Sequence, residues 1–336
     1  MDPVRSFGDY FDNPDKLFAW LNGAVFGVAA MNAVNRAGIT AALLAGPATI
    51  DELAARHGLP AAKLARVIDL LLAHGMLEID ADGVLRATDR TAAMADAAGF
   101  LANVETSALA ASKLLVGLQQ DRIPFEVQFG APVFEYFGEH PEIAAQFATF
   151  MGFMTRRVTR FLFAHHRFAP FGTVVDVGGS MGDLLLAILA EYPGTRGILF
   201  DLPEVVAMAR ARVEAAPLAG RVQLCAGSFF DRVPSADLYV LKQVLHDWDD
   251  GDCVRILGTI RAALRPGGRL VVIDHILSDT PEPNEAQGTD IAMLVWANGR
   301  ERKLAEFEAL FAASGWRIAR VSRNPSGHSA IEVVAA

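Results

Sequence analysis

The sequence predicts an α/β protein with a Rossmann-like, doubly wound sheet that follows an N-terminal helical domain. From Gly172 onward, apolar strands alternate with helical segments, which is the pattern of a largely parallel sheet. The first strand runs into the glycine turn Gly178–Gly182, and the second ends at Asp201, about 20 residues beyond that turn. A glycine turn and a later carboxylate at this spacing are typical of nucleoside-binding α/β domains.

Composition and charge restrict the class of protein. Of 336 residues, 52% are hydrophobic and 21% are charged, which indicates a well-buried globular chain long enough for two domains. The net charge of −9 argues against a nucleic-acid partner. Cys225 and Cys253 lack metal-ligand spacing, and Met1–Arg5 lacks the pattern of a signal peptide, so we expect a cytoplasmic protein.

The expected first domain, residues 1–100, combines short helices with a hairpin. Thr49 is placed to cap one helix, and a second helix ends at Gly75. The apolar stretches 76–79 and 84–87 flank an Asp-Gly turn, which predicts a hairpin. Together these elements form a winged-helix pattern, and DNA binding is the function that this pattern first suggests.

Charge argues against DNA binding by this domain. Residues 1–100 hold eight lysine and arginine residues against twelve aspartate and glutamate residues, so DNA phosphates would be repelled. The uncharged segment Leu17–Asn35 is nearly long enough to cross a bilayer, but it contains Asn22 and Asn32, and no second span follows. We therefore expect neither a membrane span nor a nucleic-acid partner, but a homodimer in which this helix is buried against the partner subunit.

Residues 101–170 are expected to form a helical connector that contributes to the substrate pocket, and residues 171–336 a catalytic domain. A terminal pair of strands would close the parallel sheet with an antiparallel element. Ligands of such sheets bind at the carboxyl ends of the strands. The expected strands are Val174–Val177, Gly197–Asp201, Val222–Cys225, Ala236–Leu241, Leu270–Ile273, 316–322 and 330–334.

The residues around the glycine turn favour a cationic nucleoside over a phosphate group. A Walker loop would end in Gly-Lys-Ser or Gly-Lys-Thr, whereas this turn ends in Gly182-Asp183, whose carboxylate repels phosphate. Asp176 precedes the glycines, which suits S-adenosylmethionine, and Asp201 is placed to accept hydrogen bonds from ribose hydroxyls. The alternative is an ordinary βαβ unit in which Asp201 only caps the next helix.

His246 follows the fourth strand and is the candidate general base. A histidine, with an unperturbed pKa of about 6.5, can convert a phenol into the more nucleophilic phenolate. Asp274 ends the fifth strand and Glu301 follows an apolar helix, so either carboxylate could orient the far ring nitrogen. The alternatives are that His246 caps a helix and that Glu301 pairs with its arginine neighbours in solvent.

Methionine and aromatic side chains suggest where a flat acceptor would bind. They fit core packing as well as they fit contact with an aromatic ligand. A polar residue among them would hold the acceptor's polar group, although the sequence does not name the acceptor. The candidate acceptor-binding residues are Phe150, Met154, Met293, Trp296 and Asn298.

The chain resembles the S-adenosylmethionine-dependent O-methyltransferases of the plant caffeate and flavonoid type and their bacterial relatives acting on polyketides and phenazines. The resemblance covers nearly all of the sequence. It implies a class I methyltransferase fold with a dimerisation domain, S-adenosylmethionine as cofactor, S-adenosylhomocysteine as product, a small aromatic acceptor and no metal. The motifs that carry it are Asp176–Gly179, Phe200–Pro203, Leu245–Trp248, Arg265–Gly268 and Gly299–Arg302.

The resemblance also implies roles for single residues. His246 would be the general base, flanked by Asp274 and Glu301. The implied cofactor-binding residues are Asp176, Gly178, Gly179, Asp201, Leu202, Ser228, Phe229 and Lys242. Three positions depart from the family pattern, which usually has Gly at Ser180, Asp at Ser228 and Glu at Asp274. We expect Ser228 to weaken cofactor binding modestly.

Two other functions stay open from the sequence. Some bacterial relatives bind S-adenosylmethionine but hydroxylate or decarboxylate polyketides, and they tend to lack the base, so the presence of His246 favours methyl transfer. A transcriptional regulator is supported only by the winged-helix pattern.

Overall fold

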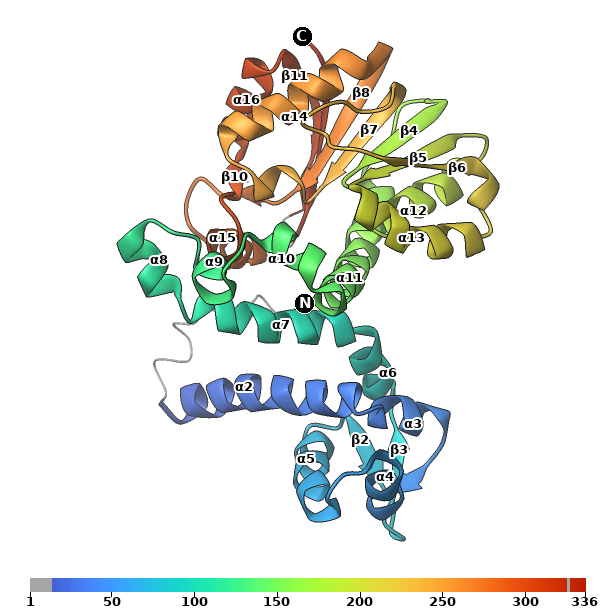
Figure 1. Cartoon of the computed structure of the whole chain (residues 1–336), viewed down its shortest axis with the longest axis vertical. Coiled ribbons are helices and arrows are strands. Elements are labelled where there is room, and N and C mark those ends of the chain that lie inside the picture. The colour runs from blue at the N-terminus through green and yellow to red at the C-terminus, as the bar shows by residue number, and fades with distance from the viewer. Residues whose placement is uncertain (1–13, 325–326) are drawn as a thin grey trace. The chain divides into compact units, whose positions relative to one another are not determined.

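The computed structural model describes residues 14–324 and 327–336, so the segment Met1–Arg5 lies outside the described residues. The chain divides into two compact units, which Figure 1 shows with their helices and strands labelled. One unit holds the described residues up to Leu109 together with Glu142–Phe153, and the other holds Ala110–Pro141 and Met154–Ala336.

The first unit contains the predicted winged-helix elements. Thr49 accepts a hydrogen bond from the backbone N–H of Glu52, whose carboxylate accepts one from the Thr49 N–H, so the predicted helix cap is confirmed. In the described part of this unit, three short strands form a sheet in the order β1-β3-β2, and both pairs are antiparallel. The elements are α2 (Pro14–Arg36), α3 (Ile39–Ala45), β1 (Ala48–Thr49), α4 (Ile50–His57), α5 (Ala61–Ala73), β2 (Leu77–Ile79), β3 (Val84–Ala87), α6 (Asp89–Asp96) and the start of α7 (Ala98–Ala111).

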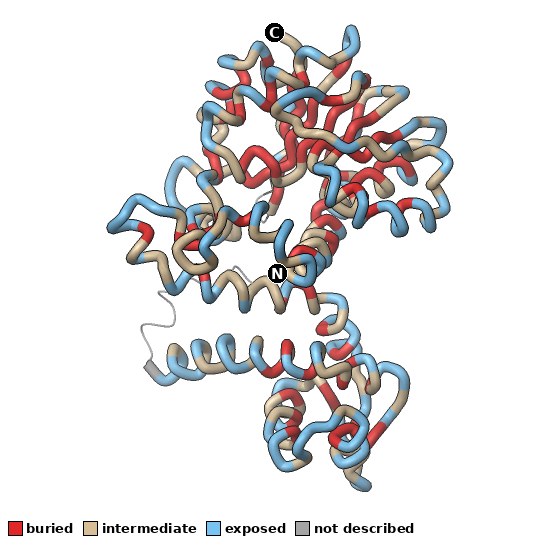
Figure 2. The backbone as a smooth tube through the Cα atoms, in the orientation of Figure 1, coloured by how far each residue is buried: buried red, intermediate tan, exposed pale blue. Residues whose placement is uncertain are grey.

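Helix α2 is apolar but largely exposed. It is long and apolar enough to cross a membrane by length and composition, and 17% of its apolar window is buried. Figure 2 shows that its buried residues concentrate toward its C-terminal half. There the Asn32 amide donates to the Leu101 carbonyl at 2.8 Å, and the Asn35 amide donates to the Met94 carbonyl at 3.3 Å. These bonds fix one end of α2 against the rest of its unit.

Helices fill the segment before the large sheet, as the sequence predicts. Four of them follow α7 in the described chain, and the last is long and crosses the boundary between the two units. They are α8 (Leu114–Gln120), α9 (Pro124–Phe129), α10 (Val133–Glu139) and α11 (Pro141–His165).

The second unit is built on a mixed sheet that confirms the predicted fold class. Within the described residues, its strand order is β11-β12-β8-β7-β4-β5-β6. Five neighbouring strands, β8, β7, β4, β5 and β6, run parallel to one another. Strand β12 is antiparallel to both of its neighbours, β8 and β11. The strands are β4 (Thr173–Val177), β5 (Arg196–Asp201), β6 (Val222–Ala226), β7 (Ala236–Lys242), β8 (Leu264–Asp274), β11 (Trp316–Ser322) and β12 (Ser329–Ala335).

Alternate residues of each strand pack on opposite faces of this sheet. Val175 belongs to a core with α14 (Asp250–Ala263) and α16 (Leu304–Ala313), whereas its neighbour Val174 belongs to a core with α11, α12 (Asp183–Glu191) and α13 (Pro203–Ala215). Both faces are therefore covered, and the carboxyl ends of β4, β5, β7 and β8 meet at one edge. The remaining elements are the 3-10 helices η1 (Ala219–Arg221) and η2 (Leu245–Asp247), the short strands β9 (Ile276–Leu277) and β10 (Arg302–Lys303), and α15 (Glu285–Trp296).

Candidate active site

The glycine turn at the end of β4 is shaped by close backbone packing. Gly178 has φ +70°, and a Cβ there would lie 3.0 Å from a methyl group of Val244. A Cβ on Gly179 would lie 2.4 Å from the side chain of Leu199, so a larger residue would clash at Gly179 and would be strained by the positive φ at Gly178. The backbone N–H groups of both glycines donate to the carbonyl of Phe200, at 2.8 and 3.3 Å. The turn is thereby fixed over the end of β5.

Asp201 holds the same turn through its carboxylate. One oxygen accepts a hydrogen bond from the Ser180 N–H and the other from the Leu202 N–H, both at 2.8 Å. Burial raises the pKa of Asp201, and these two donors oppose the rise. Ser180 has φ 50°, a left-handed conformation that is less strained in glycine, which explains why the family usually has glycine here. Asp201 does not cap α13, whose N-cap, Leu202, makes no side-chain cap bond.

Asp176 and Lys242 bring opposite charges to the edge beside this turn. Asp176 is 2% exposed, and its Oδ2 atom makes no hydrogen bond, so burial raises the pKa of its carboxyl to about 7. The Lys242 ammonium donates to the Gln243 side-chain oxygen at 2.8 Å, and burial lowers its pKa to about 8. A buried carboxylate with one oxygen free of hydrogen bonds, beside a glycine turn, fits a cationic nucleoside ligand such as S-adenosylmethionine.

His246 lies on η2 directly after β7 and is 5% exposed. Its Nδ1 atom lies 2.8 Å from Glu301 Oε1, and its Nε2 atom lies 3.6 Å from Asp247 Oδ1. With Nδ1–H donating to Glu301, Nε2 is the ring atom that can take a proton. Helix α14 is capped instead by Asp249, which accepts from the Asp252 N–H, so His246 is not a helix cap.

Glu301 is the carboxylate that orients the histidine ring. It is 1% exposed, and its backbone N–H donates to Asp290 at 2.9 Å. The neighbouring Arg300 and Arg302 pair with Asp250, so the alternative of a solvent-exposed Glu301 paired with them does not hold.

Asp274 is fully buried, but neither of its oxygens makes a hydrogen bond. It therefore does not hydrogen-bond His246, and burial raises the pKa of its carboxyl to about 7. Charge from several carboxylates nevertheless acts on the ring. Burial lowers the pKa of His246, but Glu301 and Asp247 outweigh burial and raise it to about 10. These carboxylates therefore favour the imidazolium form of His246 more than water favours it for a free histidine.

The remaining predicted cofactor residues surround the end of β6 and the start of α13. The Ser228 hydroxyl accepts a hydrogen bond from the Phe230 N–H at 3.2 Å and so shapes the loop after β6. The Phe229 ring packs edge-on against Phe230 and Trp248, with centroids at 5.0 and 5.9 Å. Leu202 is partly exposed, at 38%. Phe229 and Leu202 can offer apolar surface to the purine ring of a bound nucleoside.

The predicted acceptor residues lie on two helices. Phe150 is on the part of α11 that belongs to the first unit, and its ring lies 5.8 Å from that of Phe100. On α15, Trp296 is buried with its ring 5.2 Å from that of Phe125, Met293 is half-buried, and Asn298 just beyond the helix is exposed. Met154, also on α11, is half-buried, with its sulfur 3.8 Å from a nitrogen of Arg157.

Two features near the base were not assigned from the sequence. His275 and His328 are both buried, and their ring centroids lie 3.9 Å apart at the ends of β8 and β12. The Arg302 guanidinium is fully buried and bonds the backbone around His246. The sequence signal for Arg302 was its place in the motif Gly299–Arg302, next to Glu301. Among the residues described, no group of three or more His, Cys, Asp or Glu side chains is arranged to hold a metal ion.

Comparison with known proteins gives concordant matches. A family model described as an O-methyltransferase domain matches residues 110–317. A phenazine O-methyltransferase, PhzM of Lysobacter antibioticus, is 34% identical over 302 residues, which cover 88% of this chain and 89% of that protein. The crystal structure of LaPhzM superposes with a TM-score of 0.88 and 32% identity, covering 95% of this chain and 99% of the other.

A further solved structure carries ligands. NcsB1, an O-methyltransferase from neocarzinostatin biosynthesis, was solved with S-adenosylhomocysteine and 1,4-dihydroxy-2-naphthoic acid. It has a TM-score of 0.75 and 30% identity to this chain, covering 92% of this chain and 96% of that one.

Proposed function

Because this chain belongs to the O-methyltransferase family and its enzymes depend on S-adenosylmethionine, we propose that His246 is the general base for methyl transfer to an acceptor hydroxyl. The observation that carries the proposal is the 2.8 Å contact between His246 Nδ1 and the buried Glu301 carboxylate at the carboxyl end of β7. A histidine oriented in this way by a buried carboxylate is the usual arrangement of a base that must form an imidazolium.

Each residue of the site then has a defined task. When bound, S-adenosylmethionine supplies an electrophilic methyl group for attack by the acceptor oxygen. His246 Nε2 removes the proton of the acceptor hydroxyl, and Glu301 stabilises the resulting imidazolium. Asp201 and the glycine turn hold the nucleoside, and the burial of His246 keeps water from competing for its proton.

From the raised pKa of His246 we infer that cofactor binding and proton release are coupled. A base must be neutral before it accepts a proton, and here Glu301 and Asp247 favour the imidazolium form of the ring. The positive charge that S-adenosylmethionine would bring to this site would oppose the imidazolium charge and so lower the pKa of the ring. Asp176, with a raised pKa, and Lys242, with a lowered one, would release protons for the same reason.

We expect S-adenosylmethionine to release more protons on binding at pH 8 than S-adenosylhomocysteine, which lacks the sulfonium charge. The variant His246→Ala should reduce the difference, because linkage ties proton release to the change in pKa. Calorimetric titration in buffers of different ionisation enthalpy measures both values. Equal proton release by the two ligands in the unaltered protein would show that His246 does not sense the cofactor charge.

The acceptor we propose is a small, mostly apolar aromatic or polyketide-like molecule that carries a hydroxyl group. Trp296 and Met293 on α15 support this proposal because they offer apolar and aromatic surface. The related proteins support it too, since one is a phenazine O-methyltransferase and another was solved with a dihydroxynaphthoic acid. Asn298, which is exposed beside them, supplies a polar group for the acceptor's second substituent.

We also propose a homodimer formed through residues 1–100, as the apolar face of α2 suggests. Phe18, Val25 and Phe26 are 71%, 62% and 60% exposed on this helix. A soluble chain rarely leaves such a row of large apolar side chains in water. The double variant Phe18→Ser/Phe26→Ser should be monomeric at micromolar concentration by light scattering, whereas Met208→Ser, on the exposed face of α13, should leave the dimer intact. A monomeric unaltered protein would contradict this proposal.

A further inference from the structure

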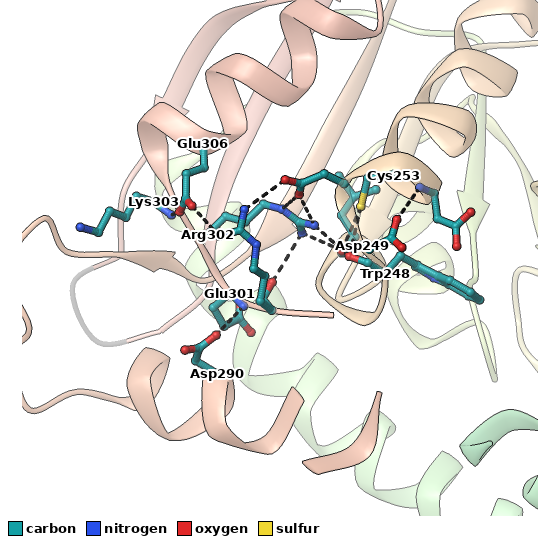
Figure 3. A network of polar contacts seen from close by, with 12 residues as sticks. Trp248, Asp249, Cys253, Asp290, Glu301, Arg302, Lys303 and Glu306 are labelled. Atoms are coloured by element: carbon teal, nitrogen blue, oxygen red, sulfur yellow. Dashed lines mark hydrogen bonds and ion pairs between the residues drawn. The ribbon is translucent and has the colours of Figure 1, made fainter. Parts of the chain in front are cut away.

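Arg302 bonds the backbone on both sides of His246. Its Nη1 atom donates to the Leu245 carbonyl and its Nη2 atom to the Trp248 carbonyl, both at 2.8 Å. Its Nε atom donates to Asp250 Oδ1 at 3.0 Å. Figure 3 shows Arg302 beside the segment that bears Trp248 and Asp249, with Glu301 directly before Arg302 in the chain. All three guanidinium nitrogens are thus hydrogen-bonded, either to Leu245–Trp248, which is the turn that carries His246, or to the start of α14.

The segment that carries Arg302 contacts the turn at two further points. Glu301 bonds the His246 ring, and a Cβ on Gly299 would lie 1.8 Å from the His246 carbonyl oxygen, so only glycine fits there. The Cys253 thiol adds a bond to the Leu245 carbonyl at 3.2 Å. Gly299, Glu301 and Arg302 therefore hold the side chain and the backbone of the base together.

The turn needs such support because it is short. η2 has three residues, Leu245–Asp247, and the carbonyls of its first residue, Leu245, and of its C-cap, Trp248, accept these side-chain bonds outside any strand. A planar guanidinium with several fixed donors can satisfy two carbonyls and a carboxylate at once, which a lysine ammonium cannot do in the same geometry.

We propose that Arg302 is a positioning residue for the base: by binding the Leu245 and Trp248 carbonyls it fixes where the His246 ring lies relative to the acceptor hydroxyl. This inference rests on the proposed role of His246. Arg302 acts through the turn and through its neighbour Glu301. It does not need to contact the acceptor.

Arg302→Lys is the primary test variant, with Arg300→Lys as its matched control. Arg300 is the adjacent arginine and also pairs with Asp250, at 3.1 Å, but its side chain is partly exposed and makes no bond to the turn. Arg302→Lys should lower kcat about 10- to 100-fold, since small misplacements of a catalytic group cost this much. S-adenosylhomocysteine affinity by calorimetry should change less than about twofold in both variants, and Arg300→Lys should keep the unaltered kcat.

A double-mutant cycle with His246→Ala separates positioning from general structural damage. If Arg302 acts through the base, adding Arg302→Lys to His246→Ala causes no further loss of kcat. Losses that multiply overturn the inference, because Arg302 would then act on another part of the site. A His246→Ala variant with unaltered kcat instead refutes the proposed base itself. Thermal unfolding checks each variant, and if Arg302→Lys does not fold, Arg302→Gln, which also cannot bond both carbonyls, takes its place in the same cycle with the same criteria.

Discussion

Replacing His246 by alanine lowers the turnover number about 10²- to 10⁴-fold at neutral pH, which is the usual contribution of general-base catalysis. The acceptor then has to lose its proton to water, and the Glu301 carboxylate loses the ring that it orients at 2.8 Å. Because His246 is not among the residues that hold the glycine turn, affinity for S-adenosylhomocysteine should change little.

Steady-state assays with labelled S-adenosylmethionine measure this change, and calorimetry measures the affinity. His165→Ala is a suitable control, since His165 is an exposed histidine at the end of α11 that is hydrogen-bonded to the Phe161 carbonyl. Unaltered turnover in His246→Ala would show that His246 is not the general base.

Replacing Asp201 by alanine weakens cofactor binding by about 1.5–3 kcal/mol, the loss expected for hydrogen bonds to a charged group. The structure adds a second reason for the loss. The carboxylate also accepts the Ser180 N–H at 2.8 Å, so its removal loosens a turn that already has a non-glycine residue at φ 50°.

Calorimetric titration with S-adenosylhomocysteine tests the role of Asp201. Glu204→Gln serves as control, because Glu204 is an exposed carboxylate in the first turn of α13 with no part in holding the glycine turn. Equal affinity of Asp201→Ala and the unaltered protein would exclude Asp201 from the cofactor site.

The fold was predictable from the sequence because its signals are local. Apolar strands buried on both faces, such as Val174–Val177, are separated by helices with clear apolar periodicity, and each predicted strand is present. The hairpin of the first unit followed from its Asp-Gly turn in the same way. Some lengths differ, as in β8, which begins at Leu264 where Leu270 was expected, and the two-residue strands β1, β9 and β10 were not predicted.

The details of the site depend on contacts between distant residues and could not be predicted. From the sequence, Glu301 and Asp274 were equal candidates to orient His246. In the structure, the pairing of β10 with β9 brings the segment containing Glu301 next to the turn that carries His246. Asp274 has a shorter side chain than the glutamate that the family usually has at this position. Its carboxylate oxygens make no hydrogen bond. The pKa of His246 follows from the three-dimensional grouping of Glu301, Asp247 and Asp274, which no spacing in the sequence reveals.

The dependence of methyl transfer on pH tests the central role of His246 most directly. The measurement is the ratio of turnover numbers of the unaltered enzyme and His246→Ala, with one phenolic acceptor, across the pKa of that phenol. The ratio should be large below this pKa and should fall as the pH rises through it, because solvent then supplies the phenolate that the missing base no longer makes. A ratio that stays constant across this range would contradict general-base catalysis by His246.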